Sequence, residues 1–258
     1  RPRWPIGLSK TSSDNIVICL QQRHINLVDD KNNIYLNDRR VADTVRFYAD
    51  LVAGPDPAGA DFNPAPGLMF RDLANGDVCA MIAPDWQIGY CKRYAPDMAG
   101  KLALMPLPKF EPSDSPTASW GGTMIGIPRD CKDPAASWKL IEALYFDHDA
   151  IAYRRQSDDI IPPIRKYWSD DVYQHGDPYF MNSQNVNQMY IQLAEELPQR
   201  YVTPFTVIAQ QLLTDGLNKA GERVDTGETK NLDRDIQVWL GGAANDLARR
   251  IEFGTFED

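Results

Sequence analysis

The sequence between residues 73 and 147 contains the features that decide the fold. LANGDVCAMIAPDW (residues 73–86) predicts a helix end followed by a short apolar strand, and LALMPLPKF (residues 102–110) predicts an extended segment. SWGGTMIGIPRDCKDP (residues 119–134) predicts a Gly-Gly turn, a second strand and a proline-bounded loop. AASWKLIEALYFD (residues 135–147) then predicts an amphipathic helix. Strands that alternate with helices in this way favour an α/β fold.

Four elements are expected between residues 15 and 83. Residues 15–20 predict a short apolar strand or the start of a buried helix, and residues 38–52 predict an amphipathic helix with Asp38 as its N-cap. Residues 69–75 predict a helix that ends at Gly76. Residues 78–83 predict a buried strand.

Proline, glycine and apolar periodicity divide the rest of the chain. The proline-rich segments at residues 54–67 and 106–116 predict surface loops. Beyond residue 147 the chain is predicted to be mostly helical. Pro162 and Pro163 break the first helix, a second ends near Pro198, a third begins at Thr206, and Gly241-Gly242 interrupts the last.

The charge balance excludes several classes of partner. The 258 residues carry 36 acidic and 27 basic side chains, for a net charge of -9. Nucleic acids and anionic membrane surfaces both require clustered Lys and Arg, so neither is an expected partner. No apolar run approaches the roughly 18 residues that span a bilayer.

The four cysteines do not have the spacing of a metal site, and no cofactor is expected. No two of them form a CxxC pair, and the three histidines are scattered. Cys79 and Cys91 flank a predicted strand and helix start, so a disulfide between them is one interpretation outside the cytoplasm. The alternative is that they are small buried apolar residues.

Five residues at two predicted strand ends are the strongest candidates for ligand contact. A neutral sugar offers hydroxyl groups to polar side chains and C–H faces to aromatic rings. Asp85 and Trp86 follow one strand, and Trp120, Gly121 and Gly122 precede the other, where strand ends open into a crevice. The alternative is that Trp86 packs a helix onto the sheet with Asp85 as its N-cap, and that the Trp-Gly-Gly segment is a plain turn.

Aromatic residues in two later loops are weaker candidates for the same site. Tyr179 lies in DPYF and Tyr201 in YVTPF, and aromatic side chains in loops line sites or pack cores about equally often. Arg154 and Arg155, on a predicted helix, are more typical of a solvated face.

Several motifs occur in an order that resembles the family 1 extracellular solute-binding proteins, the sugar-type receptors of ABC importers. NGDVCAM (residues 75–81) with PDW (residues 84–86) is similar to the helix and strand that close with Gly-x-Trp in that family. MPLP (residues 105–108) is similar to its P-L-P segment, and GGTMIGI (residues 121–127) with KDPAASWKLI (residues 132–141) to its GG strand and following helix. Asp77 and Pro84 depart from the family's usual lysine and glycine.

The resemblance implies a two-lobed periplasmic-binding-protein-like (type II) α/β fold, of which this chain is the C-terminal portion. The first part of the N-terminal lobe is expected to be missing, together with any export signal or lipid anchor. Residues 1–112 would form the first segment of the C-terminal lobe, residues 113–170 the returning segment of the N-terminal lobe, and residues 171–258 the final helical segment.

The resemblance also implies a function without a chemical step. The protein would bind a sugar or oligosaccharide in an interlobe cleft, close by hinge motion and deliver the ligand to ABC permease subunits in the periplasm or outside the cell. It would meet the membrane only through the permease or a lipid anchor. A receptor for another solute, such as a polyamine or peptide, is an alternative.

A glycoside hydrolase is the competing enzyme class. That chemistry requires two carboxylates about 5–10 Å apart. Asp85, Asp158, Asp159 and Asp177 are candidates, but none has an obvious partner in the sequence. The chain also has no GxSxG, HExxH, Walker A or Rossmann glycine motif, so we expect a binding protein.

Overall fold

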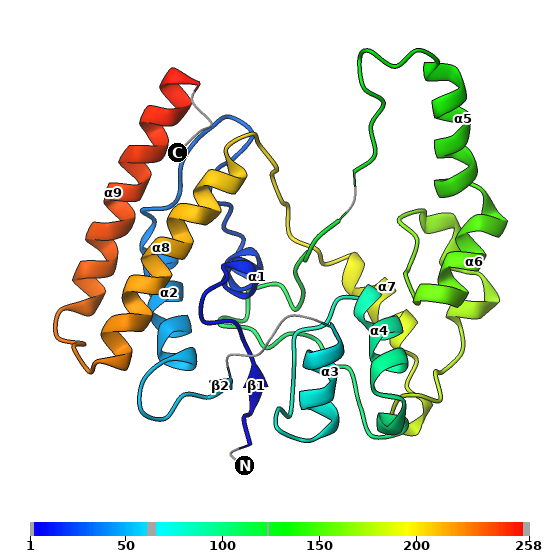
Figure 1. The fold of residues 1–258 in the computed structure, drawn as a ribbon, viewed down its shortest axis with the longest axis horizontal. Helices are drawn as coiled ribbons and strands as arrows, with labels where there is room; N and C mark the ends of the chain where they lie inside the picture. Colours follow the sequence, from blue (N-terminus) through cyan, green and yellow to red (C-terminus); the bar gives the residue numbers. More distant parts are fainter. Residues whose placement is uncertain (1–2, 61–65, 123, 255–258) are drawn as a thin grey trace. The chain divides into compact units, whose positions relative to one another are not determined.

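Helices account for most of the regular secondary structure (Figure 1). The computed structural model describes residues 3–60, 66–122 and 124–254. These residues form two units. Unit 1 consists of Arg1–Ile82, Leu107–Ser119 and Glu196–Asp258, and unit 2 consists of Ala83–Pro106 and Trp120–Glu195.

Unit 1 is built around four helices that share one hydrophobic core. They are α1 (Asp14–Gln22), α2 (Arg39–Val52), α8 (Thr206–Asp225) and α9 (Leu232–Phe253). The helices α2, α8 and α9 pack against one another, as Figure 1 shows. The core comprises apolar residues from all four helices, including Ile16, Val45, Leu213, Leu217, Ile236 and Leu240.

The helix predicted at residues 38–52 is confirmed as α2. The Asp38 carboxylate accepts a hydrogen bond from the backbone N–H of Arg40 at 2.8 Å, which satisfies one of the free donors at the helix start. Val41, Val45 and Tyr48 recur on one face and are all buried. The local pattern therefore determines both where this helix begins and which face it buries.

The remaining regular elements of unit 1 are short. They are β1 (Ile6–Gly7), β2 (Gly59–Ala60) and α3 (Pro66–Ala74), with β1 and β2 paired in parallel. The predicted end of the helix at Gly76 is confirmed, because Gly76 has φ +72° and its N–H donates to the Leu73 carbonyl at 3.0 Å.

The buried strand predicted at residues 78–83 is wrong in its extent. Val78 and Met81 form only isolated parallel bridges, to Trp4 and Gly7. The ladder does not continue between these bridges, because the Ile6 N–H donates to the Ala58 carbonyl at 3.4 Å, on the β2 side. Residues 15–20 are helical, as one of the two predicted alternatives, and lie within α1.

Unit 2 consists of helices joined by irregular segments. Its α-helices are α4 (Trp86–Tyr94), α5 (Pro134–Tyr145), α6 (His148–Asp158) and α7 (Val186–Ala194). Short 3₁₀ turns lie at Pro96–Met98, Arg165–Tyr167, Asp171–Tyr173 and Met181–Ser183. The helix predicted at residues 135–147 is confirmed as α5, where the Asp133 carboxylate accepts from the Ala136 N–H at 2.9 Å.

Two further predictions made from glycine pairs are wrong. Gly241-Gly242 does not interrupt the last helix, because α9 continues through both glycines. The strand predicted after Gly122 is absent from the described residues 124–127, which have no regular secondary structure and no backbone hydrogen bond to another described residue.

The two units differ in their boundaries from the lobes that the family resemblance implies. The unit boundaries do not coincide with the predicted segments 1–112, 113–170 and 171–258, and the two-lobed α/β fold stays a prediction. Among the described helices, none combines the length and the apolar character that crossing a bilayer requires.

Candidate ligand-binding site

Trp86 and Trp120, predicted as stacking residues, lie together in unit 2. Their ring centroids are 6.3 Å apart, with an interplanar angle of 60°. Trp86 is the first residue of α4, and the Tyr90 ring lies one turn later, 5.8 Å from it. Tyr94 follows 6.2 Å beyond Tyr90. We call Trp86, Tyr90, Tyr94 and Trp120 the aromatic cluster.

The sequence analysis missed two members of the aromatic cluster. Tyr90 and Tyr94 follow Trp86 at positions i+4 and i+8, which lie on one face of a helix. This spacing is visible in the sequence and would have identified them once α4 was predicted. Trp86, Tyr90 and Trp120 are partly exposed, so ring surface remains for a ligand.

The Asp85 carboxylate is held beside this cluster by unit 2 itself. Asp85 Oδ2 accepts a hydrogen bond from the Ile161 N–H at 2.9 Å, and the side chain makes no capping bond to α4. Asp85 thus occupies the N-cap position of α4, as one of the two alternatives predicted, but its carboxylate caps no backbone N–H of that helix. Burial raises the pKa of this carboxyl, while backbone N–H donors and the positive charge of Arg155 oppose the rise. A partly desolvated carboxylate is a strong acceptor for hydroxyl groups.

Gly121 and Gly122 are needed for their backbone conformation. Their φ angles are +94° and +112°, a region that L side chains rarely adopt. A Cβ atom at either position would meet nothing within 4 Å, so crowding is not the reason for glycine. Both residues are exposed and follow Trp120 directly in the chain.

Tyr179 is anchored inside unit 2. It is only 9% exposed, and its hydroxyl donates to the Ala95 carbonyl at 2.6 Å and lies 3.1 Å from the Cys91 carbonyl. Burial raises the pKa of this hydroxyl well above its usual range. The contacts fasten the C-terminal end of α4, and a direct ligand contact from Tyr179 stays a prediction.

Tyr201 belongs to unit 1. Its backbone N–H donates to Asn26 Oδ1 at 2.9 Å. The residue lines a small hollow of unit 1 together with Gln21, Asn26 and Gln210. These amide side chains are suited to hydroxyl groups, but the role of Tyr201 likewise stays a prediction.

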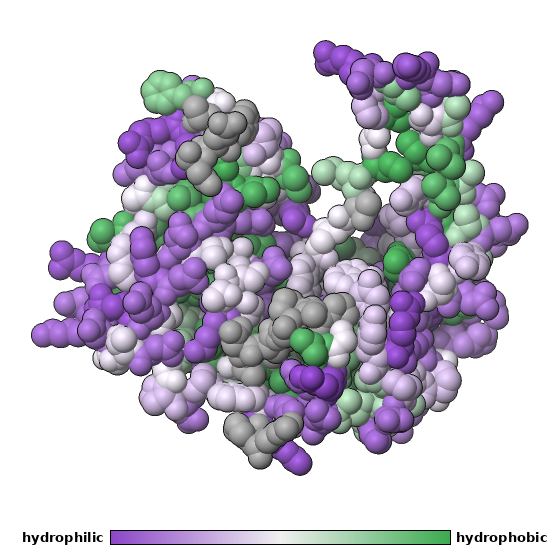
Figure 2. Space-filling view, viewed as in Figure 1, coloured by the Kyte–Doolittle hydropathy of each residue, from purple (hydrophilic) through white to green (hydrophobic). Residues whose placement is uncertain are grey.

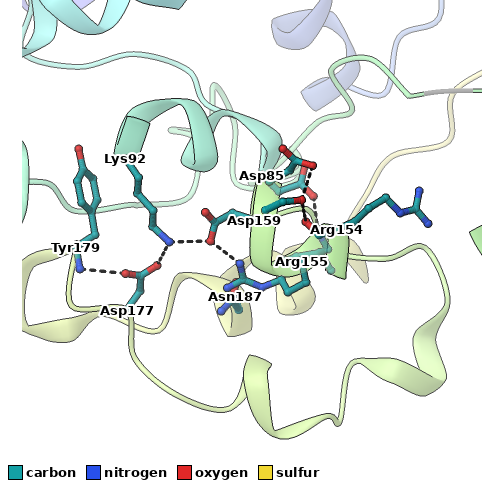
Figure 3. Close-up of polar contacts among 11 residues, drawn as sticks. Asp85, Lys92, Arg154, Arg155, Asp159, Asp177, Tyr179 and Asn187 are labelled. Carbon is teal, nitrogen blue, oxygen red and sulfur yellow. Dashed lines mark hydrogen bonds and ion pairs between the residues drawn. The ribbon is translucent and has the colours of Figure 1, made fainter. Parts of the chain in front are cut away.

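A partly buried network of ion pairs joins four side chains of unit 2 (Figure 3). Lys92 Nζ, on α4, lies 2.7 Å from Asp159 Oδ1 and 2.6 Å from Asp177 Oδ2. Arg155, on α6, also pairs with Asp159. The Asp159 and Asp177 side chains are 10% and 11% exposed. We call Lys92, Arg155, Asp159 and Asp177 the ion network.

The expectation that Arg155 lies on a solvated face is wrong. Arg155 is 8% exposed, donates to Asn187 Oδ1 at 3.0 Å and lies over the Tyr173 ring at 5.7 Å. Its neighbour Arg154 points away from the network in Figure 3 and lies over the Tyr145 ring. Asp159 is a local partner at position i+4, but Asn187 is 32 residues away, so the local pattern indicates an ion pair and not the burial of Arg155.

The ion network also bears on the hydrolase alternative. Asp159 and Asp177 are both paired with Lys92, so both carboxylates already neutralise a cation. Asp158 lies 3.8 Å from Arg93 and is about half exposed. Among the described residues no group of three or more His, Cys, Asp or Glu side chains is arranged to hold a metal ion.

The Cys79–Cys91 disulfide, one of the two interpretations of these cysteines, is not formed. All four cysteines are free thiols, with Cys79 exposed and Cys91 buried. Burial raises the pKa of the Cys91 thiol, and burial raises that of Cys19 to about 12. The alternative, a buried apolar role, is the one that describes Cys91.

Comparison with known proteins shows a distant similarity to bacterial oligosaccharide-binding proteins. The chain is 24% identical over 220 residues to the arabinooligosaccharide-binding protein of Halalkalibacterium halodurans, a match that covers 77% of this chain and 46% of that protein. It is also 24% identical over 133 residues to the arabinooligosaccharide-binding protein of Bacillus subtilis, covering 50% of this chain and 30% of that protein. The chain thus spans half or less of the length of these relatives. No family model and no solved structure matches.

Proposed function

We propose that this chain is part of the substrate-binding component of an ABC importer, and that it binds a sugar or oligosaccharide. Similarity to two proteins named for binding an arabino-oligosaccharide is the observation that carries this proposal. Delivery to permease subunits and a periplasmic or extracellular location, with or without a lipid anchor, are part of the same proposal.

The site proposed for the sugar is the aromatic cluster together with Asp85. Trp86 and Trp120 offer partly exposed rings to the C–H faces of a sugar. Asp85 offers a carboxylate to its hydroxyl groups. Gly121 and Gly122 add backbone groups without side chains in the way. The interlobe cleft expected from the family resemblance stays a prediction.

Isothermal titration calorimetry with defined ligands tests the proposal. Arabino-oligosaccharides of increasing length, other neutral oligosaccharides, a polyamine and a short peptide would each be titrated into the protein. We expect binding to one class of sugar. Trp86→Ala and Trp120→Ala should each weaken it about 2- to 12-fold, since the contact of one aromatic ring is worth about 0.5–1.5 kcal/mol.

Trp138→Ala is the matched control. Trp138 is also a partly exposed tryptophan of unit 2, but its ring neighbour is Phe146, outside the aromatic cluster. We expect this variant to bind the sugar like the parent protein. If all three variants lose affinity equally, the loss reports instability and the aromatic cluster is not the site.

The same titrations separate the alternative functions. Binding of the polyamine or peptide, with no sugar bound, would replace the sugar assignment with a different solute. Release of new reducing ends during incubation with an oligosaccharide would instead support a glycoside hydrolase. We expect neither, because Asp159 and Asp177 are committed to the ion network.

A further inference from the structure

Arg93 lies on the same face of α4 as the aromatic cluster. It follows Trp86 at position i+7 and Tyr90 at position i+3, and side chains at this spacing project from one side of a helix. The guanidinium carbon of Arg93 lies 5.9 Å from the centre of the Tyr90 ring, within the range of a cation–π contact. The aromatic cluster therefore includes a cation in its immediate surroundings.

The charge of Arg93 is only weakly engaged by the part of the chain that the structure describes. Its ion-pair partner there is Asp158, with Arg93 Nη2 3.8 Å from Asp158 Oδ1, which is too long for a hydrogen bond. The two side chains are 54% and 47% exposed. The preceding residue, Lys92, is instead held by both carboxylates of the ion network. The guanidinium N–H donors of Arg93 therefore remain available to a further partner.

The surface around α4 suits a hydrated ligand more than an apolar one. In Figure 2 the visible surface of unit 2 near α4 is mostly of intermediate to hydrophilic character. Trp86 and Tyr90 are partly exposed, and Tyr94 is 47% exposed. Rings set among polar groups suit the C–H faces and hydroxyl groups of a sugar, whereas a protein or lipid partner requires a continuous apolar patch.

We propose that the aromatic cluster selects an acidic oligosaccharide, in which a uronic acid unit lies beside Tyr90 and its carboxylate binds Arg93. The inference rests on the sugar-binding function proposed above and adds the class of sugar. A guanidinium presents parallel N–H donors that match the two oxygens of a carboxylate. A uronic acid unit carries this carboxylate and keeps a C–H face for the Tyr90 ring.

The charges on α4 also set the direction in which the ligand lies. Asp85 directly precedes Trp86 at the start of the helix, and Arg93 lies in its last turn. A carboxylate on the sugar unit at Trp86 would be repelled by Asp85, whereas the same group at Tyr90 meets Arg93. The Trp86 and Tyr90 rings are 5.8 Å apart, a separation comparable with the advance of one unit along an oligosaccharide. The unit on Trp86 is therefore neutral, and the acidic unit is its neighbour.

Isothermal titration calorimetry with matched ligands tests the proposal. Each set would contain a short neutral oligosaccharide, the same chain with one hexose replaced by its hexuronic acid, and the methyl ester of that acid, which keeps the shape without the charge. We expect the acid to bind about 3- to 10-fold more tightly than the other two, because a partly exposed but bidentate ion pair forms. The preference should shrink as salt is added, since this pair is screened.

Two substitutions should change the preference in opposite directions. Arg93→Gln should make the acid and the ester bind equally. Asp158→Asn removes the carboxylate that competes for Arg93 and should increase the preference roughly twofold. Arg154→Gln is the matched control, because Arg154 also lies over a tyrosine ring of unit 2, that of Tyr145 at 4.6 Å, outside the aromatic cluster. This control should keep the preference of the parent protein.

The possible outcomes separate this inference from the proposed function. Equal binding of the acid, the ester and the neutral chain would overturn the inference and leave sugar binding in place. A preference for the acid that persists in Arg93→Gln would also overturn it, because another cation would then hold the carboxylate. Failure of every oligosaccharide to bind would overturn the proposed function, and the acidic class of ligand with it.

Discussion

Replacing Lys92 with methionine tests how the ion network stabilises unit 2. Methionine keeps much of the length and apolar volume of the lysine stem but removes the ammonium group. In the parent protein this group lies 2.7 Å from Asp159 and 2.6 Å from Asp177, and both carboxylates are about 10% exposed. The substitution leaves Asp159 paired with Arg155 and leaves Asp177 with the Tyr179 backbone N–H at 3.0 Å.

The burial of each partner sets the expected magnitude. Removing one partner from a fully buried ion pair costs about 3–5 kcal/mol, whereas an exposed pair contributes about 0–1 kcal/mol. The Lys92 side chain is 30% exposed, so water screens part of its interaction. Asp159 keeps a second cation, so the main loss falls on Asp177. We therefore expect unit 2 to lose about 2–3 kcal/mol.

Hydrogen exchange of peptides from α4, α6 and α7 is the appropriate assay, because a chain with two units need not unfold in one step. The matched control is Lys101→Met, which removes an exposed lysine of unit 2 that has no ion pair among the described residues. A loss below about 1 kcal/mol, equal to that of the control, would refute the argument. It would mean that Asp177 is solvated in solution and that the network does not hold the helices together.

Three further substitutions probe other parts of the structure. Asp85→Asn should stabilise the protein at neutral pH, because burial raises the pKa of the Asp85 carboxyl in the folded state. The gain in unfolding free energy, measured by urea titration, should shrink as the pH falls and vanish below about pH 4, and a gain that does not change with pH would contradict this explanation. Gly89→Ala should lower the unfolding free energy, again measured by urea titration, by about 1–3 kcal/mol, because a Cβ at residue 89 would lie 2.7 Å from the Asp158 carbonyl oxygen. An increase in stability, as helix propensity alone predicts, would show that α4 and α6 separate easily. Gln22→Leu removes the hydrogen bonds that the Gln22 amide donates to the Pro108 and Ser115 carbonyls, each at 3.0 Å, and should speed proteolysis of the proline-rich loop at residues 106–116. Gln211→Leu, which replaces an exposed glutamine, is the control and should leave that rate unchanged.

Local sequence patterns predicted the elements whose determinants are local. The Asp38 cap and the Val41, Val45 and Tyr48 spacing contain all the information needed for α2. The burial of Arg155 could not be predicted, because its partner Asn187 is 32 residues away. Apolar segments are also ambiguous, since a helix and a strand of similar composition differ only in which neighbours they meet.

The candidate site was predictable in part for the same reason. Trp86 and Trp120 were identified individually from the residues expected at strand ends, but their 6.3 Å contact depends on how α4 packs in unit 2. Asp85 was interpreted as a helix cap or a ligand residue because both roles require the same carboxylate. Its hydrogen bond from the Ile161 N–H, 76 residues away, could not be predicted from the sequence, and its contact with a ligand stays a prediction.

The contacts along α4 affect how tightly a ligand can bind at Trp86, the first residue of this helix. Tyr179 fastens the last turn, Lys92 ties the middle to two carboxylates, and Gly89 lets α6 approach within contact of the helix backbone. Trp86 therefore projects from a helix that is fixed at three successive turns. A ring that is already immobile loses little conformational entropy when a sugar stacks on it, so more of the contact energy appears as affinity. Loosening α4 through Gly89→Ala should accordingly weaken sugar binding even though residue 89 touches no ligand, and calorimetry should show the loss as a less favourable binding entropy.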